Sequence, residues 1–152
     1  MGLLEKITDD CGTVYTANYD RAGRLIKEKR RADSEKSYVY DSLGNITEAQ
    51  NAYGKTVYRY DSGACLIYQK DVTTGEEVYF EYDDAGNRIK LLSTNRETSY
   101  TYGKNNEVKE IFDNKQRISV QLNYDKNGRE VLRKFGNETS EVTLYDGFTF
   151  DV

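Results

Sequence analysis

The chain has 152 residues, about one ordinary domain, with 22 basic and 26 acidic side chains and a net charge of −4. This mild negative charge argues against a general binder of nucleic acid or of a membrane surface, because both attract positively charged proteins. Histidine is absent, which excludes Ser-His-Asp and Cys-His catalysis and any His-ligated metal site.

No run of 18 apolar residues occurs, so we expect no membrane insertion. The first residues also lack the charged and apolar regions of a signal peptide. The two cysteines, Cys11 and Cys65, are too few for a four-thiolate zinc site. Whether they pair is open, and two unpaired thiols are the favoured alternative.

A repeat of about 21 residues is the main signal in the sequence. The dipeptide Tyr-Asp recurs every 20 to 22 residues, at Tyr19-Asp20, Tyr40-Asp41, Tyr60-Asp61, Tyr82-Asp83, Tyr124-Asp125 and Tyr145-Asp146, with a degenerate copy at Tyr102-Gly103. We therefore predict one repeat domain over 1–152. It comprises a partial first repeat at 3–18, repeats starting near 19, 40, 60, 82, 102 and 124, and a terminal partial repeat at 142–152.

Each unit begins with a short strand that ends on the motif tyrosine. The turn Asp-x-x-Gly follows, because Asp can bond backbone amides further along and Gly tolerates a left-handed backbone. These turn glycines are Gly23, Gly44, Gly86 and Gly128. The turn predicts a tight hairpin with a glycine bulge, followed by a second strand and a less regular turn near mid-repeat.

Three kinds of departure from the pattern occur. Gly63 arrives one place early in the third unit, and in the fifth unit Gly103 and Asn106 replace Asp and Gly. Asn is the next best residue for the left-handed position. Arg88 and Glu130 stand where other units place an apolar residue at the start of the second strand, which predicts a local register shift in those two units.

The predicted fold class is all-β: an antiparallel hairpin meander of about 12 to 14 strands, in about seven repeats, forming a curved or spiralling strip. No helix is expected. One unit buries too little apolar area to offset its backbone entropy, so each depends on its neighbours. The strip has two edges, and curling on itself or pairing edge to edge would both satisfy the pattern.

The pattern Tyr-Asp-x-x-Gly-Asn/Arg-Ile/Leu resembles the YD repeat (RHS repeat) family, which includes bacterial Rhs and wall-associated polymorphic toxins, shell subunits of insecticidal toxin complexes, and teneurins. Three stretches carry it best: 19–25, 40–46 and 82–88. The resemblance implies a β-shell that encapsulates a toxin polypeptide, or a surface scaffold, in a secreted or cell-surface protein. It also implies the remainder of a larger YD-repeat protein as partner, or self-association through sheet edges.

The tyrosines also suggest a ligand face, since flat rings with a polar tip suit glycans or peptides. Its candidates are Tyr38, Tyr58 and Tyr100, although cross-strand packing is the favoured role. The motif aspartates are expected to form turns, and the carboxylate pairs Asp83-Asp84 and Glu76-Glu77 are weak candidates for glycoside hydrolysis because strand neighbours point to opposite faces.

Two further patterns have simple alternatives. The basic cluster Arg21, Arg24, Lys27, Lys29, Arg30 and Arg31 favours a solvated strand over a polyanion site. Glycosylation sequons begin at Asn45 and Asn137, a triplet that is common by chance. We expect no catalytic residue, no metal and no cofactor. The sequence predicts a non-enzymatic structural segment, with a carbohydrate-binding adhesion module as the alternative.

Overall fold

The structure is a computed structural model, and it describes residues 3–136, 139–144 and 148–151. Contacts between Cα atoms group the chain into two compact units, Met1–Glu77 and Val78–Val152, and each is described by itself. A helical membrane span is absent from the described part of the chain, because no helix there is long and apolar enough to form one.

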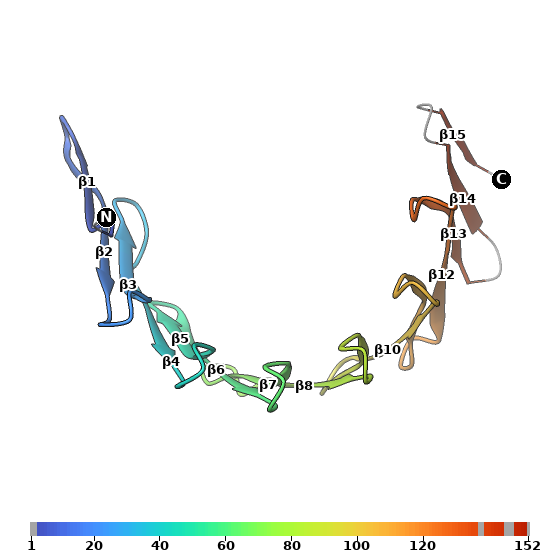
Figure 1. Cartoon of the computed structure of the whole chain (residues 1–152), viewed down its shortest axis with the longest axis horizontal. Coiled ribbons are helices and arrows are strands. Elements are labelled where there is room, and N and C mark those ends of the chain that lie inside the picture. The colour runs from blue at the N-terminus through green and yellow to red at the C-terminus, as the bar shows by residue number, and fades with distance from the viewer. Residues whose placement is uncertain (1–2, 137–138, 145–147, 152) are drawn as a thin grey trace. The chain divides into compact units, whose positions relative to one another are not determined.

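Both units are built from antiparallel strands joined by short turns (Figure 1). The first unit contains β1 (Lys6–Asp9), β2 (Gly12–Tyr19), β3 (Leu25–Arg30), β4 (Lys36–Tyr40), β5 (Ile46–Asn51), β6 (Gly54–Tyr60) and β7 (Leu66–Asp71). The strands that follow are β8 (Glu77–Tyr82), β9 (Arg88–Ser93), β10 (Glu97–Tyr102), β11 (Val108–Asp113), β12 (Ile118–Tyr124), β13 (Glu130–Phe135), β14 (Thr139–Leu144) and β15 (Phe148–Asp151).

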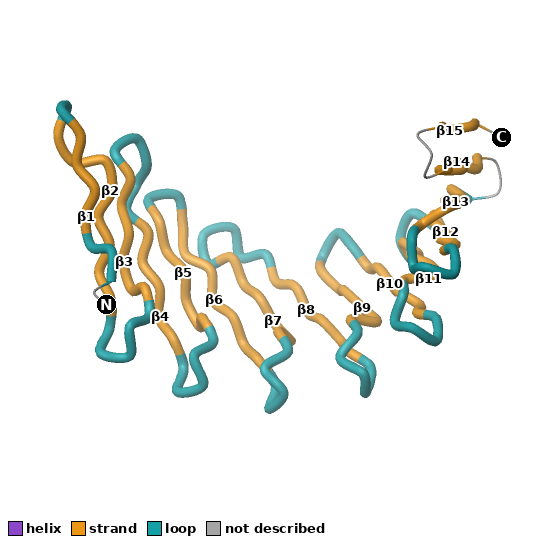
Figure 2. The backbone as a smooth tube through the Cα atoms, turned by 45° about the horizontal axis from the view of Figure 1, so that its top comes forward, coloured by secondary structure: helices purple, strands orange, loops and turns teal. Residues whose placement is uncertain are grey.

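Within each unit, every strand pairs with the next one along the chain, as Figure 2 shows for β1 to β7. The same holds from β8 to β15. The predicted all-β antiparallel meander is confirmed. Its 15 strands in the described residues slightly exceed the 12 to 14 expected. The motif tyrosine is the last residue of β2, β4, β6, β8, β10 and β12.

The Asp-x-x-Gly turn has the same backbone geometry in successive repeats. In the first, the Gly23 amide donates to the Asp20 carbonyl (3.0 Å) and the Asp20 amide donates to the Arg24 carbonyl (2.9 Å). Gly23 has a φ of 80°, and Gly44, Gly86 and Gly128 are also left-handed. This is a type I turn closed by a glycine bulge, which sets the hairpin twist.

A second irregularity follows each turn, inside the second strand. Asn18 pairs with Lys27 but the next residue, Tyr19, pairs with Leu25, so that one residue of β3 is left over. Tyr82 faces Arg88 and Tyr124 faces Glu130 in the same register. The predicted local register shift is present at Arg88 and Glu130, but the same shift occurs in the other repeats, so it does not arise from these two side chains.

The register gives the sheet two chemically different faces. One, which we call the tyrosine face, carries in the first unit Tyr19, Leu25, Glu28, Lys36, Tyr38, Tyr40, Ile46, Ala49, Tyr58, Tyr60 and Leu66. The opposite face carries diagonal ion pairs, such as Lys55 with Glu48 (2.6 Å), among apolar residues such as Val39 and Val57. In the second unit Lys90 pairs with Glu97 (3.3 Å).

Within the described residues, each unit is a single-layer sheet without an enclosed core. Of the apolar side chains that the structure describes, Ala17 alone is buried, at 4% exposure. Ser93 and Thr98 are the buried polar residues in those stretches. Thr98 is held by the Arg96 Nε, which donates to its hydroxyl (3.0 Å). Strand pairing and side-chain rows must therefore replace a second layer in stabilising the fold.

The third repeat keeps the turn length despite its displaced glycine. Ala64 takes the left-handed position with a φ of 62°, while its amide donates to the Asp61 carbonyl (3.1 Å). In the fifth repeat Asn106 takes this position as predicted, with a φ of 61°. A Cβ is strained in this region, and alanine has no side-chain hydrogen bond to compensate.

We therefore predict that Ala64→Gly raises the free energy of unfolding by about 1 kcal/mol, since the left-handed backbone costs a non-glycine residue about 1–2 kcal/mol and added chain entropy offsets part of the gain. Urea unfolding followed by circular dichroism measures it. Gly44→Ala, at the matched position of the second repeat, should lower the midpoint instead. A lower midpoint for Ala64→Gly would contradict the prediction.

Candidate functional site

The hydroxyl of the motif tyrosine connects a repeat to the one before it at Tyr19, Tyr40, Tyr60 and Tyr102. Tyr40 donates to the Leu25 carbonyl (2.7 Å), and Tyr60 donates to the Ile46 carbonyl (2.9 Å). Tyr19 binds the Leu4 carbonyl (2.9 Å) in the same way. Each accepting residue lies 14 or 15 positions back, and Leu25 and Ile46 stand beside the bulge of the preceding hairpin. A bulge interrupts the ladder of backbone hydrogen bonds, which leaves room for a side-chain donor.

The same bond occurs in the second unit, where the Tyr102 hydroxyl donates to the Arg88 carbonyl (2.8 Å). Partial burial raises the pKa of Tyr60 and of Tyr102 above the ordinary tyrosine value. Both hydroxyls therefore remain protonated donors at neutral pH. We refer to this tyrosine-to-carbonyl bond as the repeat hook.

The motif aspartate organises the turn through both oxygens of its carboxylate. In the second repeat, Asp41 Oδ1 accepts from the amides of Leu43 and Asn45 (both 2.9 Å), and Oδ2 accepts from Asn45 Nδ2 (2.9 Å). Asp83 and Asn87 repeat the arrangement. The Asn45 side chain, followed by the turn amides, lowers the pKa of Asp41, so this carboxylate stays charged.

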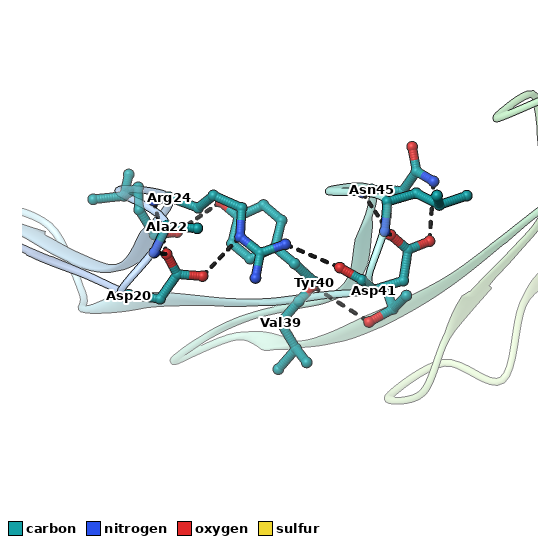
Figure 3. Close-up of polar contacts among 10 residues, drawn as sticks. Asp20, Ala22, Arg24, Val39, Tyr40, Asp41 and Asn45 are labelled. Carbon is teal, nitrogen blue, oxygen red and sulfur yellow. Dashed lines mark hydrogen bonds and ion pairs between the residues drawn. The ribbon is translucent and has the colours of Figure 1, made fainter.

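In the first repeat, the residue after the turn glycine is an arginine, Arg24, in place of the asparagine. This arginine connects its own turn to the turn of the next repeat. Arg24 Nε donates to Asp20 Oδ2 (2.7 Å), while Arg24 Nη1 donates to the Asp41 carbonyl (2.9 Å). Its guanidinium lies over the Tyr40 ring, 4.8 Å from the centroid (Figure 3). One side chain therefore joins two turns and covers the ring that carries the repeat hook.

In the degenerate fifth turn, a different residue supplies the carboxylate that accepts from a turn amide. Gly103 has no side chain, but the Oε2 of Glu107, four residues on, accepts from the Asn105 amide (2.9 Å). A Cβ on Gly103 would collide with this carboxylate. The accepting carboxylate has thus moved from the first to the fifth residue of the turn, an arrangement that we call the exchanged turn, and glycine is required where the glutamate reaches back.

The mid-repeat turns are joined by backbone and cationic groups. The Arg31 amide donates to the Val14 carbonyl (2.8 Å), and the Val72 amide donates to the Lys55 carbonyl (2.8 Å). In the second unit, Lys115 Nζ donates to the carbonyl oxygens of Ser93 and Thr94. Both edges of the described hairpins therefore carry bonds between repeats.

The candidate ligand-face residues Tyr38, Tyr58 and Tyr100 are half-buried. Tyr38 donates to Glu28 Oε1 (2.9 Å), and burial followed by this bond raises the pKa of Tyr38 to about 12. Arg88 Nη2 lies 3.5 Å from the Tyr100 hydroxyl. A ligand role for the three remains a prediction.

The motif aspartates that the structure describes face their own turn amides. Asp61 accepts from the Gly63 and Cys65 amides (both 2.9 Å), and Asp125 accepts from Asn127 and Arg129. Tyr124 ends β12 as expected. The motif Tyr145-Asp146 lies outside the described residues.

The remaining candidate features are occupied by structural contacts. Glu77 accepts from Tyr68 (3.0 Å) and Lys70 (2.8 Å), and Asp83 belongs to its turn. Within the basic cluster, Arg24, Lys27 and Arg31 pair with Asp20, Glu35 and Asp9. The Asn45 amide of the first sequon is bound to Asp41, and Asn137 lies outside the described residues.

Cys11 and Cys65 are free thiols. The described stretches contain no group of three or more carboxylate or thiol side chains placed to hold a metal ion. Sequence reasoning missed the residue after the turn glycine: Arg24, Asn45, Asn87 and Arg129 each donate to the motif aspartate. Their recurrence at one position was the available signal.

A family model described as "Teneurin YD-shell" matches residues 5–147 of the chain. The tRNA nuclease WapA of Bacillus subtilis (strain 168) is 31% identical over 121 residues, which cover 74% of this chain and 5% of that protein. The tRNA3(Ser)-specific nuclease WapA of Bacillus spizizenii matches with the same identity and coverage. The chain thus spans a small part of these curated relatives.

Solved structures share the fold. The TcdB2-TccC3-Cdc42 crystal structure is 12% identical, with a TM-score of 0.71 over 88% of this chain and 8% of that chain. The Photorhabdus luminescens Tc holotoxin pore is 18% identical, with a TM-score of 0.69 over 93% of this chain and 9% of that chain. At such identities the likeness concerns the fold alone.

The repeat hook predicts a specific cost for losing one hydroxyl. Tyr40→Phe should lower the free energy of unfolding by about 1–2 kcal/mol, because a hydrogen bond is lost and the Leu25 carbonyl is left without its donor. Thermal unfolding by circular dichroism measures the change. Tyr53→Phe, at a turn residue that is 85% exposed, is the control and should have no effect. Equal melting temperatures for the two variants would show that the repeat hook does not stabilise the fold.

The exchanged turn predicts a coupled pair of substitutions. Gly103→Asp alone should lower the melting temperature, since a second carboxylate meets Glu107, and Glu107→Asn alone should lower it by removing the acceptor for Asn105. The double variant recreates the Asp41/Asn45 arrangement and should melt above both single variants. A double-mutant cycle by thermal unfolding tests this. Additive losses would disprove the exchange.

Proposed function

The chain belongs to the Teneurin YD-shell family, and from this premise we propose that it is a non-enzymatic structural segment of a larger YD-repeat protein. In that role its strands contribute to a β-shell around a toxin polypeptide, in a secreted or cell-surface protein. The shell role of the family and the fold shared with Tc toxin components support the proposal.

The repeat hook is the observation that carries this proposal. Tyr40 and Tyr60 bind the preceding repeat through main-chain oxygens, so the contact does not depend on which side chains the preceding repeat bears. A junction of this kind can be added repeat after repeat, as an extended wall requires. The near absence of buried side chains in the described residues also suits a wall that other parts of a shell cover.

The alternatives draw less support from the chain. The WapA relatives are named as nucleases, but this chain matches only 5% of the length of those proteins. The motif aspartates that the structure describes are engaged in turns, so they are poorly placed to act as an acid and base pair. A carbohydrate-binding module is the runner-up from the sequence, and no contact in the structure favours it over peptide binding.

Light scattering across a wide range of protein concentration tests the structural role. A segment of a longer wall exposes strand edges that seek further strands, so we expect the mass to rise with concentration. Circular dichroism at each concentration shows that the protein stays folded. A folded monomer at every concentration would overturn the proposal in favour of a self-contained module.

A further inference from the structure

The first full repeat contains a contact between a tyrosine and a glutamate that has no counterpart in the second repeat. Glu28 lies on the tyrosine face, and its Oε1 accepts the Tyr38 hydroxyl (2.9 Å). The tyrosine belongs to β4, and the glutamate belongs to the strand before it, β3. The carboxylate therefore occupies the tyrosine face beside the ring and takes its proton donor.

One repeat later, the glutamate is replaced by alanine. Glu28 faces Ala17 in the ladder between β2 and β3, and Ala49, 21 residues on, stands at the corresponding place in β5. Tyr58 of β6 corresponds to Tyr38. Its hydroxyl has no hydrogen-bond partner in the part of the chain that the structure describes, and alanine offers no acceptor.

An open pocket of about 340 Å³ lies at this place. Tyr38 and Tyr58 line it from β4 and β6, two strands that pair with either side of β5. Ala49 and Thr56 line it between them, and all four side chains are half-buried. Neighbouring repeats place longer side chains, Glu28 and Gln69, at the position of Ala49. The pocket therefore has room for one side chain of that length.

The charged side chains that line the pocket are Lys36, Lys55 and Asp71. Lys36 faces Glu28 in the ladder between β3 and β4 and forms no ion pair within the described residues, while Lys55 pairs with Glu48 (2.6 Å) on the opposite face. Asp71 is the acidic residue of the lining, and its Oδ1 accepts from the amides of Thr73 and Thr74 (2.8 and 3.0 Å). The Tyr58 hydroxyl, a donor without an acceptor in the described residues, suits a carboxylate, and the nearby Lys36 ammonium adds to this preference.

We propose that the pocket over Ala49 binds a carboxylate on a short hydrocarbon stem, namely the glutamate side chain of a polypeptide that lies on the tyrosine face. The stem packs between the rings of Tyr38 and Tyr58, the Tyr58 hydroxyl donates to the carboxylate, and Lys36 supplies the charge. The site uses residues 36–58 of one unit, so it does not depend on the proposed shell role.

The test is an NMR titration of the whole chain with a capped peptide, Gly-Ser-Gly-Glu-Gly-Ser-Gly, against the same peptide carrying Gln. We expect saturating shifts at the Ala49 amide and the Tyr58 ring. The Gln peptide should bind at least about tenfold more weakly, because a charged acceptor makes the stronger hydrogen bond. Glucuronate serves as a second probe, since its carboxylate belongs to a sugar.

Three variants locate the site. Ala49→Glu places a carboxylate where Glu28 has one, so it should abolish peptide binding. Ser42→Glu adds the same charge at an exposed turn and should bind as the parent does. Tyr58→Phe should weaken binding without displacing the backbone, which keeps the test valid if Ala49→Glu misfolds.

Several results would overturn the proposal. Equal affinity for the Glu and Gln peptides would show that the pocket does not recognise charge. Retained binding by a folded Ala49→Glu variant would place the peptide elsewhere. Binding of glucuronate without binding of the peptide would assign the pocket to a sugar acid. None of these results bears on the light-scattering test of the structural role.

Discussion

The structure depends on one hydrogen bond, donated by the hydroxyl of the motif tyrosine to a main-chain carbonyl in the preceding repeat. A single-layer sheet cannot gain its stability from an enclosed core, and Ala17 is the one buried apolar residue in the described stretches. Each repeat must therefore be held by its neighbour through the ladder, the aromatic rings and this bond. Tyrosine suits the position because it combines a large apolar ring with a polar tip that reaches the next strand.

The turns show that the position of a carboxylate matters more than the residue that supplies it. Asp41 and Asp83 each bind two backbone amides and the Asn four residues on. In the fifth repeat Glu107 supplies the carboxylate from the far side of the turn, over Gly103. Both solutions satisfy amides that would otherwise lack a partner at a sheet edge. The degenerate Tyr102-Gly103 copy is thus an alternative form of the same turn.

The sequence was sufficient for the features that arise from neighbouring residues. The period, the strand ending on tyrosine and the left-handed position at Asn106 follow from local chemistry, and the structure has all three. The second bulge, which lies inside the strand after each turn, was not predicted, because it depends on how two strands pair. The register shift expected only at Arg88 and Glu130 is for this reason common to the other repeats. The Tyr38–Glu28 contact was also out of reach, since it requires the register of β3 with β4.

The repeat separates the residues that build the sheet from those that give its face a chemical character. Tyrosine, aspartate and the residue after the turn glycine are engaged in bonds that hold the strands. The position of Glu28, Ala49 and Gln69 takes no part in the hook or the turn, so its side chain can vary without altering the backbone. A charged, a small and an amide side chain follow one another there. A strip with this arrangement can carry different binding chemistry in successive repeats while the strand pairing between them is kept.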